Sequence, residues 1–471
     1  MTGLLRASTL ALAMALCAAG EARAQNVPQL PDPSDRPLVV DVSRDPILQL
    51  SRARENYEEF RSLIAAAVER HPGTAESFAA TEEARAYVRE ARERQGIGGD
   101  FSLSSYRILS REFSNDPQNI VERQRPEQRT DATLTVQQTI FDFGAGDARV
   151  AAARAQQRGA AAELEGSADR VALAAVAAWY EVFGYRALVG LTDAFIASQR
   201  DLKLSVEERI RAGVSAEGDV ARVESYIAST QTRAARYRRQ LANAEARFTE
   251  LTGSPPPPDV ERAPAPPLAA AATRDAATLA AETSAPVRAA EAAAEAAKRE
   301  AKATKRDEYG ALTAGVDAGR YGVFENERDY DIRGRVTFRQ RLFGGVEART
   351  SQMQARARAA EARADRIREE AARDAAIAFS DVQALEAQLK SIEAAYIAAR
   401  QSRDVIAERF RSARGSLFDV VAAEDAYFDA AASFVQSLTE LDAARYVLLS
   451  RTGRLLDALA IAPETLGGPK K

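Results

Sequence analysis

The side chains that could carry chemistry in this chain include a single histidine, His71. It stands directly before Pro72, where the sequence predicts a break between two helices, so we expect a surface or capping role for it. One histidine at such a break does not favour a histidine-based triad, and it excludes a multi-histidine metal site. We therefore predict no catalytic residue, no metal site and no cofactor.

Carboxylates are abundant, but most lie three or four residues from an arginine, as in residues 363–370. That spacing is typical of a solvated helix face. Glycine-rich phosphate-binding loops are absent from the sequence, and Gly344-Gly345 follows a predicted strand without implying a ligand. These patterns predict that the protein is not an enzyme.

Four arginines share one parity in residues 330–343, where they alternate with apolar side chains: Arg333, Arg335, Arg339 and Arg341. Alternation over about ten residues is the pattern of a tilted membrane strand with one face toward lipid and the other toward water. The alternative is a half-buried sheet of a soluble protein, but four charges on one face do not suit a packed core. We predict that these arginines line a barrel lumen and favour anions.

This strand belongs to a motif that occurs twice. Residues 133–144 and 335–345 both alternate, end in Gln-x-(Ile/Leu)-Phe followed by glycine, and precede a long helix rich in Ala, Arg and Glu. Downstream, Thr252-Gly253 matches Thr452-Gly453. A period near 200 residues is too long for a solenoid module, so it indicates a duplicated half-protein.

The elements that must position these residues follow the same duplication. The helix predicted over 346–412 would be about 100 Å long at 1.5 Å per residue, which no globular core of this size requires. The expected organisation is a signal peptide at 1–24, an extended lead-in at 25–45, a first repeat at 46–254 with strands at about 101–110 and 131–141, a Pro-rich linker at 255–267, a second repeat at 268–457 with strands at about 309–323 and 330–343 and helices at 346–412 and 417–456, and a tail at 458–471.

The N-terminus predicts export from the cytoplasm. Arg6 precedes an apolar run that is too short to span a membrane, and Ala22-Arg23-Ala24 is a typical cleavage site. The only cysteine, Cys17, lies inside this segment. The formal net charge of −4 is spread over charges of both signs, so we expect no nucleic-acid partner.

Four strands cannot close a membrane barrel, because open edges in lipid leave backbone groups unpaired. Two chains would supply eight strands, and side chains would fill the interior of such a barrel. Three chains would supply twelve strands and leave room for water. A conducting pore therefore favours a homotrimer in contact with outer-membrane lipid.

The duplicated strand–glycine–helix motif, together with the helix turns at 211–220 and 411–420, resembles the TolC family of outer-membrane efflux and secretion channels. The resemblance covers nearly all of the mature chain. It implies a mainly α fold with membrane β: duplicated long α-hairpins forming a periplasmic α-barrel, and four strands per chain in a trimeric twelve-stranded barrel. It also implies a periplasmic adaptor and an inner-membrane transporter of the ABC or RND type as partners.

The resemblance assigns further roles to the two helix turns. Their residues would dock the adaptor at the periplasmic tip: Gly213, Val214, Ser215, Ala413, Arg414, Gly415 and Ser416. Asp419 would belong to an acidic ring at the channel entrance. The alternative is that Asp419 caps the helix that follows. The chain departs from the family pattern at Ala413, where glycine is usual, and at Ala422, the second acidic position of the entrance.

These inferences predict an outer-membrane exit duct of a tripartite efflux or type I secretion system in a Gram-negative bacterium, with a large periplasmic part. The alternative function is a non-conducting periplasmic coiled-coil adaptor or scaffold. Adaptors have one long α-hairpin between small β domains, whereas this sequence predicts two hairpins and two strand pairs.

Overall fold

The computed structural model describes residues 30–31, 33–34, 37–52, 57–113, 118, 120, 126–266, 268, 271–325, 329–412 and 414–462. The predicted signal peptide and Ala413 lie outside these residues. The chain forms two compact units, and each combines segments from both sequence halves. The first unit is Met1–Ala75, Ser167–Thr283 and Ala371–Lys471, and the second is Glu76–Gly166 and Ser284–Glu370.

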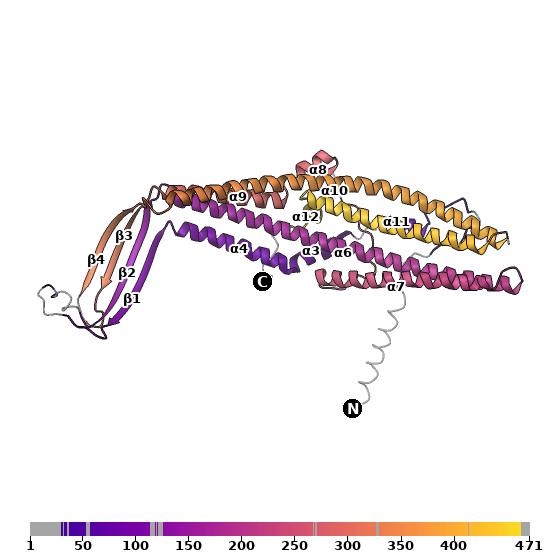
Figure 1. Cartoon of the computed structure of the whole chain (residues 1–471), viewed down its shortest axis with the longest axis horizontal. Helices are drawn as coiled ribbons and strands as arrows, with labels where there is room; N and C mark the ends of the chain where they lie inside the picture. The colour runs from indigo at the N-terminus through magenta and orange to yellow at the C-terminus, as the bar shows by residue number, and fades with distance from the viewer. Residues whose placement is uncertain are drawn as a thin grey trace, which may run out of the picture. The chain divides into compact units, whose positions relative to one another are not determined.

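The second unit contains an antiparallel sheet of four strands in chain order (Figure 1). Its strands are β1 (Ile97–Arg107), β2 (Gln128–Phe141), β3 (Ala311–Arg320) and β4 (Tyr330–Arg339). The centre of the sheet joins the two sequence halves, because Val136 of β2 lies opposite Val316 of β3. The duplicated motif therefore builds one sheet rather than two.

Strand ends differ from the predicted ones where pairing stops. The last strand ends at Arg339, opposite Ala311, and not at 343. Beyond it the Gln340 side chain donates a hydrogen bond to the Glu308 carbonyl oxygen, so this segment has left the ladder. The first strand begins earlier than predicted, because Ile97 already lies opposite Gln138.

Each strand is preceded or followed by a helix, and the two long helices that follow β2 and β4 have residues in both units. α4 (Pro72–Glu93) leads into β1 and α9 (Ala285–Asp307) leads into β3, whereas α6 (Ala145–Arg211) follows β2 and α10 (Val346–Arg411) follows β4. Alanines let these helices approach closely: a Cβ added at Gly159 of α6 would lie 3.5 Å from the Ala292 Cβ of α9. Ion pairs such as Arg368–Glu291 and Lys298–Glu361 join α10 to α9.

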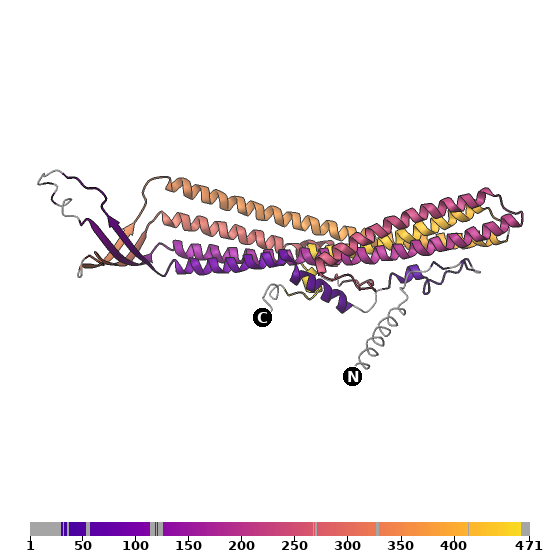
Figure 2. The ribbon, with the colours of Figure 1, turned by 90° about the horizontal axis from the view of Figure 1, so that it is seen from below.

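The first unit contains two helix hairpins, which residues 167–211 of α6 form with α7 (Gly218–Thr252) and residues 371–411 of α10 form with α11 (Leu417–Arg451) (Figure 2). The last predicted helix, 417–456, is interrupted at Gly453, whose φ of +68° ends α11 before the short α12 (Leu455–Ala458). The remaining short helices of this unit are α2 (Pro46–Gln49), α3 (Tyr57–Arg70) and α8 (Arg274–Ala281).

An aromatic core holds the first unit together. Phe60 of α3 packs edge-on against Trp179 of α6 with ring centroids 5.3 Å apart, and it also contacts Tyr446 of α11. Leu459 and Ile461 are buried in the same core. Residues 459–461, which the sequence assigns to a tail, therefore belong to the folded unit.

Among the described residues, α6 alone contains a stretch long and apolar enough to cross a membrane, and 67% of that stretch is buried. A helix that is buried in a protein core has the same apolar composition as a membrane span. The stretch is thus weak evidence for a membrane span.

Candidate membrane sheet and helical turns

The register of the sheet sorts its side chains into two faces. Residues opposite each other in neighbouring strands point to the same side, so the lines Asp100–Thr135–Asp317–Arg333 and Phe101–Leu134–Ala318–Ile332 belong to opposite faces. Side-chain hydrogen bonds run across the first face: Ser102 to Thr133 at 2.7 Å, and Thr135 to Asp317 at 2.9 Å. We call these the polar face and the apolar face.

The apolar face is exposed on the single chain. Val336 and Phe101 are 72% and 71% exposed among the described residues. The other large apolar side chains that share this face and are exposed are Ile97, Leu103, Leu134, Val316, Tyr330, Ile332 and Phe338. A contiguous surface of this kind normally meets lipid or another protein.

The polar face places Arg333, Arg335 and Arg339 together, as the parity of the sequence predicts, whereas Arg341 lies beyond the end of β4. The prediction of an anion-favouring face needs correction, because two of these arginines, Arg333 and Arg335, have counter-ions. Arg333 pairs with Asp331, and the Arg335 Nη2 lies 3.6 Å from an Asp317 carboxylate oxygen.

A third ion pair joins Arg129 to Asp131 on β2, with Nε and Oδ1 2.6 Å apart. The polar face thus carries four arginines and four aspartates, and its formal charge is zero. The sequence-based prediction of an anion-favouring face counted only the arginines and left out the aspartates of the same parity, Asp331 on β4 itself and Asp131 on β2. The signal was present, since Asp317 has the polar parity of its strand.

The first helical turn reverses the chain between α6 and α7. Gly213 has φ +74°, a left-handed conformation that favours glycine, and the Val214 amide donates to the Arg209 carbonyl oxygen at 2.8 Å. This is a glycine-terminated helix end. Val214 is 56% exposed, and Ser215 lies 3.4 Å from the Arg209 Nε.

The second turn ends in a helix cap. Ser416 is the N-cap of α11: its hydroxyl oxygen accepts from the Asp419 amide at 3.2 Å and donates to the Asp419 carboxylate at 2.8 Å. Asp219, the matching residue of the first half, accepts from the Ala216 amide at 3.2 Å. In the second half the cap is therefore Ser416, and the Asp419 carboxylate bonds to that capping hydroxyl rather than to a backbone amide.

The two turns lie against each other. The Arg209 guanidinium donates to the Phe410 carbonyl oxygen at 2.8 Å and stands 4.3 Å from the centre of the Phe410 ring. Beneath them, both hairpins contribute to one apolar cluster: Val206, Val223, Phe410, Leu417, Val420 and Val421. Phe418, beside this cluster, is 60% exposed.

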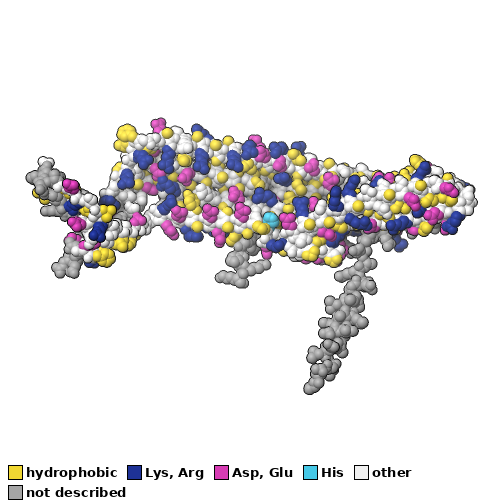
Figure 3. Space-filling model, turned by 60° about the horizontal axis from the view of Figure 1, so that its bottom comes forward, with side chains coloured by type: hydrophobic (Ala, Val, Ile, Leu, Met, Phe, Trp, Pro, Cys, Tyr) yellow, Lys and Arg dark blue, Asp and Glu magenta, His cyan; other side chains and the backbone are white. Residues whose placement is uncertain are grey.

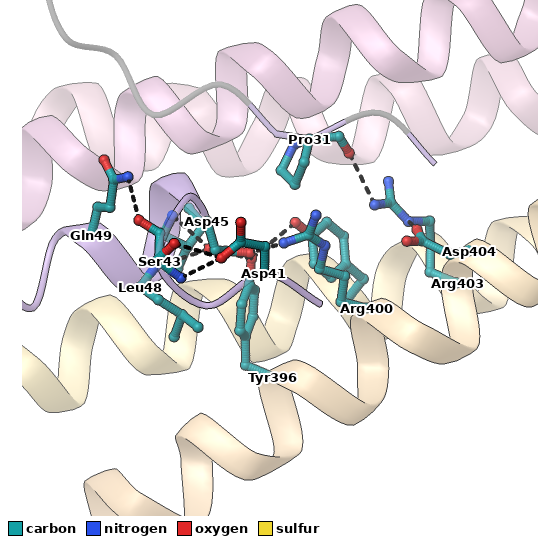
Figure 4. Close-up of polar contacts among 12 residues, drawn as sticks. Pro31, Asp41, Ser43, Asp45, Leu48, Gln49, Tyr396, Arg400, Arg403 and Asp404 are labelled. Carbon is teal, nitrogen blue, oxygen red and sulfur yellow. Dashed lines mark hydrogen bonds and ion pairs between the residues drawn. The ribbon is translucent and has the colours of Figure 1, made fainter. Parts of the chain in front are cut away.

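A buried polar cluster attaches the N-terminal segment to the second hairpin (Figure 4). Asp45 is 1% exposed and caps α2, where it accepts from the Ile47 and Leu48 amides at 2.9 Å each. From α10, the Tyr396 hydroxyl donates to its carboxylate at 2.8 Å, and Arg400 forms an ion pair with it.

The tyrosines of this cluster stay protonated. Burial raises the pKa of Tyr396, and it raises that of Tyr427, whose hydroxyl is 3.1 Å from that of Tyr396, to about 12. Both hydroxyls therefore remain available as donors near neutral pH.

One turn further along α10, Arg403 is 2% exposed and has two acidic neighbours. Its Nε lies 2.7 Å from Asp404 Oδ1, its Nη1 lies 3.7 Å from Glu424 Oε1, and its Nη2 donates to the Pro31 carbonyl oxygen at 2.9 Å. Burial raises the pKa of Glu424, and Arg403 opposes that shift. The sequence analysis did not identify Arg403, Asp404 or Glu424 as candidate functional residues.

Acidic and basic side chains are interspersed over the helices (Figure 3). Among the described residues, no group of three or more His, Cys, Asp or Glu side chains could hold a metal ion. The predicted capping role of His71 is confirmed, since its Nδ1 accepts from the Gly73 amide at 3.0 Å.

Comparison with known proteins connects these features to a family. Residues 63–254 match the model of the outer membrane efflux protein family. No curated protein matches the sequence of the chain.

Solved structures with the same fold include three outer-membrane proteins, two of which are described as channels. The outer membrane protein VceC from Vibrio cholerae has a TM-score of 0.73 at 18% identity, over 85% of this chain and 97% of its own. The CmeC channel of Campylobacter jejuni has a TM-score of 0.71 at 12% identity, over 92% and 95%. The Neisseria gonorrhoeae MtrE channel in its open state has a TM-score of 0.68 at 16% identity, over 84% and 89%.

Proposed function

We propose, because this chain resembles the TolC family in sequence over residues 63–254 and in fold over most of its length, that three copies form the exit duct of a tripartite efflux or type I secretion system. The match to the outer membrane efflux protein model supports the predicted location, an outer membrane with a large periplasmic part. It describes a transport protein and not an enzyme.

The observation that carries the proposal is the exposed apolar face of the sheet. A water-soluble adaptor would have to bury side chains such as Val336 and Phe101, whereas a barrel wall would turn them toward lipid. The opposite face is polar and charge-balanced, as the wall of a water-filled duct can be. Among the strands that the structure describes, none pairs with the outer edge of β1 or of β4, which supports closure with further copies.

The paired helical turns support docking of a periplasmic adaptor and, through it, an ABC or RND transporter. Val214 and Phe418 are exposed apolar side chains at the turns, and Arg209 together with the cluster beneath holds the turns in a fixed arrangement. An adaptor tip that buries those two side chains would recognise the pair of turns rather than either alone. Arg414, Gly415 and Ser416 belong to the same proposed surface.

The entrance role proposed for Asp419 is compatible with its hydrogen bond to the N-cap residue Ser416. The carboxylate is held at the first turn of α11 by Ser416, and three copies around an axis would repeat it as an acidic ring. Such a ring attracts cations and narrows the entrance. The proposal for Arg333, Arg335 and Arg339 is that they line the duct as ion pairs that hydrate the wall, without a net charge.

Planar-bilayer recording of the purified, full-length protein tests the proposal. We expect discrete conductance steps from a heat-dissociable trimer extracted from the outer membrane. A protein that is released from the periplasm without detergent, and that produces no conductance, would instead have the properties of the adaptor or scaffold.

A further inference from the structure

Two charged side chains on the polar face are left over after its ion pairs are formed. Arg129, Arg333 and Arg335 have Asp131, Asp331 and Asp317 as counter-ions. Asp100 and Arg339 form no ion pair and no side-chain hydrogen bond with the described residues. One is an anion and the other a cation, and both point to the same side of the sheet.

The two unpaired residues lie on opposite edges of the sheet. Asp100 is in β1 and Arg339 is in β4, and each of these two strands pairs with a single other strand among the described residues. Since the four strands alternate in direction, β4 of one copy and β1 of the next would meet as antiparallel neighbours. Their polar faces coincide only if the stagger between them is an even number of residues.

The geometry of a tilted barrel limits that stagger. Four strands about 4.8 Å apart span about 19 Å, and a tilt of about 35–45° converts this into about 13–19 Å along the strands, or about four to six residues. Within the sheet, Asp100 is level with Arg333. A stagger of six in one direction places it opposite Arg339, and a stagger of four places it opposite Thr337, one diagonal step from Arg339.

The opposite direction of stagger can be set aside. It would move Asp100 past Tyr330, the first residue of β4, and leave almost no paired residues at the junction. In the direction that keeps the strands paired, Arg339 lies either directly opposite Asp100 or at a diagonal position. The long arginine side chain can reach Asp100 from either place.

We propose that Asp100 of one copy forms an ion pair with Arg339 of the next, so that each junction between copies in the barrel contains one such pair. This inference rests on the proposed trimeric barrel. It completes the counter-ions of the polar face, and it gives each copy an edge that accepts only the opposite edge of the same chain in one narrow range of registers.

Charge exchange tests the pair in the full-length protein. Asp100→Arg and Arg339→Asp should each lower the temperature at which the detergent-extracted trimer dissociates, and the double variant should recover most of the loss. Arg341→Asp is the matched control, because it makes the same charge change beyond the end of β4. If the double variant dissociates no higher than the lower of the two single variants, the pairing is wrong.

A cross-link gives an independent readout. Two co-expressed copies, one with Asp100→Cys and the other with Arg339→Cys, should be joined by a short bifunctional thiol reagent at least about tenfold more than a pair using Phe338→Cys, which lies on the apolar face. Equal linkage would overturn the inference. If the unmodified protein forms no trimer, the proposed function fails as well. If trimers are stable but neither the charge exchange nor the cross-link gives the expected result, only the ion pair is wrong.

Discussion

Replacing Asp45 by alanine should release the N-terminal segment from the second hairpin. The fully buried Asp45 carboxylate accepts hydrogen bonds from two α2 amides and from the Tyr396 hydroxyl, and it forms an ion pair with the Arg400 guanidinium. No other described carboxylate is within ion-pair distance of Arg400. The change therefore removes a helix cap and leaves a nearly buried cation without its counter-ion.

The size of the effect follows from these two losses. Loss of an N-cap costs about 1 kcal/mol, and removal of one partner from a buried ion pair costs about 3–5 kcal/mol. The Arg400 side chain is 12% exposed and can recover some hydration, so the two losses do not simply add. We expect the free energy of opening the segment to fall by about 3–5 kcal/mol in total.

Hydrogen exchange at Gln49 and Leu50 measures this directly. Their amides donate to the backbone oxygens of Asp45 and Ile47, so the substitution leaves their own acceptors in place. A loss of about 3–5 kcal/mol corresponds to exchange roughly 10² to 5 × 10³ times faster, provided that local opening controls the rate. Asp45→Asn should give a smaller increase, because an amide oxygen can still cap the helix.

Asp41→Ala is the matched control on the same segment. Asp41 is exposed, and its partners among the described residues are Ser43 and Arg44, so its removal should change exchange at Gln49 and Leu50 less than about threefold. If Asp45→Ala behaves like this control, the buried cluster does not hold the segment.

Four further predictions concern the membrane sheet, the turns and the buried acid. Cysteine at Val336 should react with lipid-soluble probes and cysteine at Arg335 with water-soluble ones; equal reactivity would contradict the membrane assignment. At Gly213, where no neighbouring atom is in the way, valine would have to adopt a left-handed conformation that costs about 1–2 kcal/mol. Gly213→Val should therefore abolish export while trimers persist, and normal export would exclude docking at this turn. Asp419→Ala should reduce cation selectivity and divalent-cation block in single-channel recordings, and unchanged values would leave only the cap. The folded state raises the pKa of Glu424 above its usual 4.5, so the contribution of this group to the stability of the protein is lost as the pH rises through the raised pKa. Glu424→Gln should reduce the fall of the melting temperature between pH 4 and 8, and an unchanged dependence of the melting temperature on pH would refute this prediction.

Much of the fold could be predicted because its signals are local. Alternation with period two marks β4 and β2, and glycine is absent from the long helix that begins at Val346. The duplication then indicated that both halves repeat one plan. Strand ends were less predictable, because Arg339 ends β4 only by virtue of its pairing with Ala311.

The buried polar contacts could not be predicted from spacing. Asp45 and Arg400 are 355 residues apart, and Arg262 donates two hydrogen bonds to the buried carboxylate of Asp442, 180 residues away. Each of these side chains also has nearby charges that suggest ordinary surface pairs. Only the packing of the N-terminal segment and the linker onto the hairpins gives each its actual partner.

The charge of the polar face illustrates the same limit at the candidate site. Read along β4 alone, Arg333, Arg335 and Arg339 predict a cationic duct, because their parity places them on one side. Asp317 cancels part of that charge from the neighbouring strand, and its position opposite Arg333 depends on the register between the two strands. The remaining imbalance, a free anion at one edge and a free cation at the other, is a property of the whole sheet. It therefore becomes visible only when all four strands are aligned, and it is this alignment that turns a list of charged residues into a prediction about how copies meet.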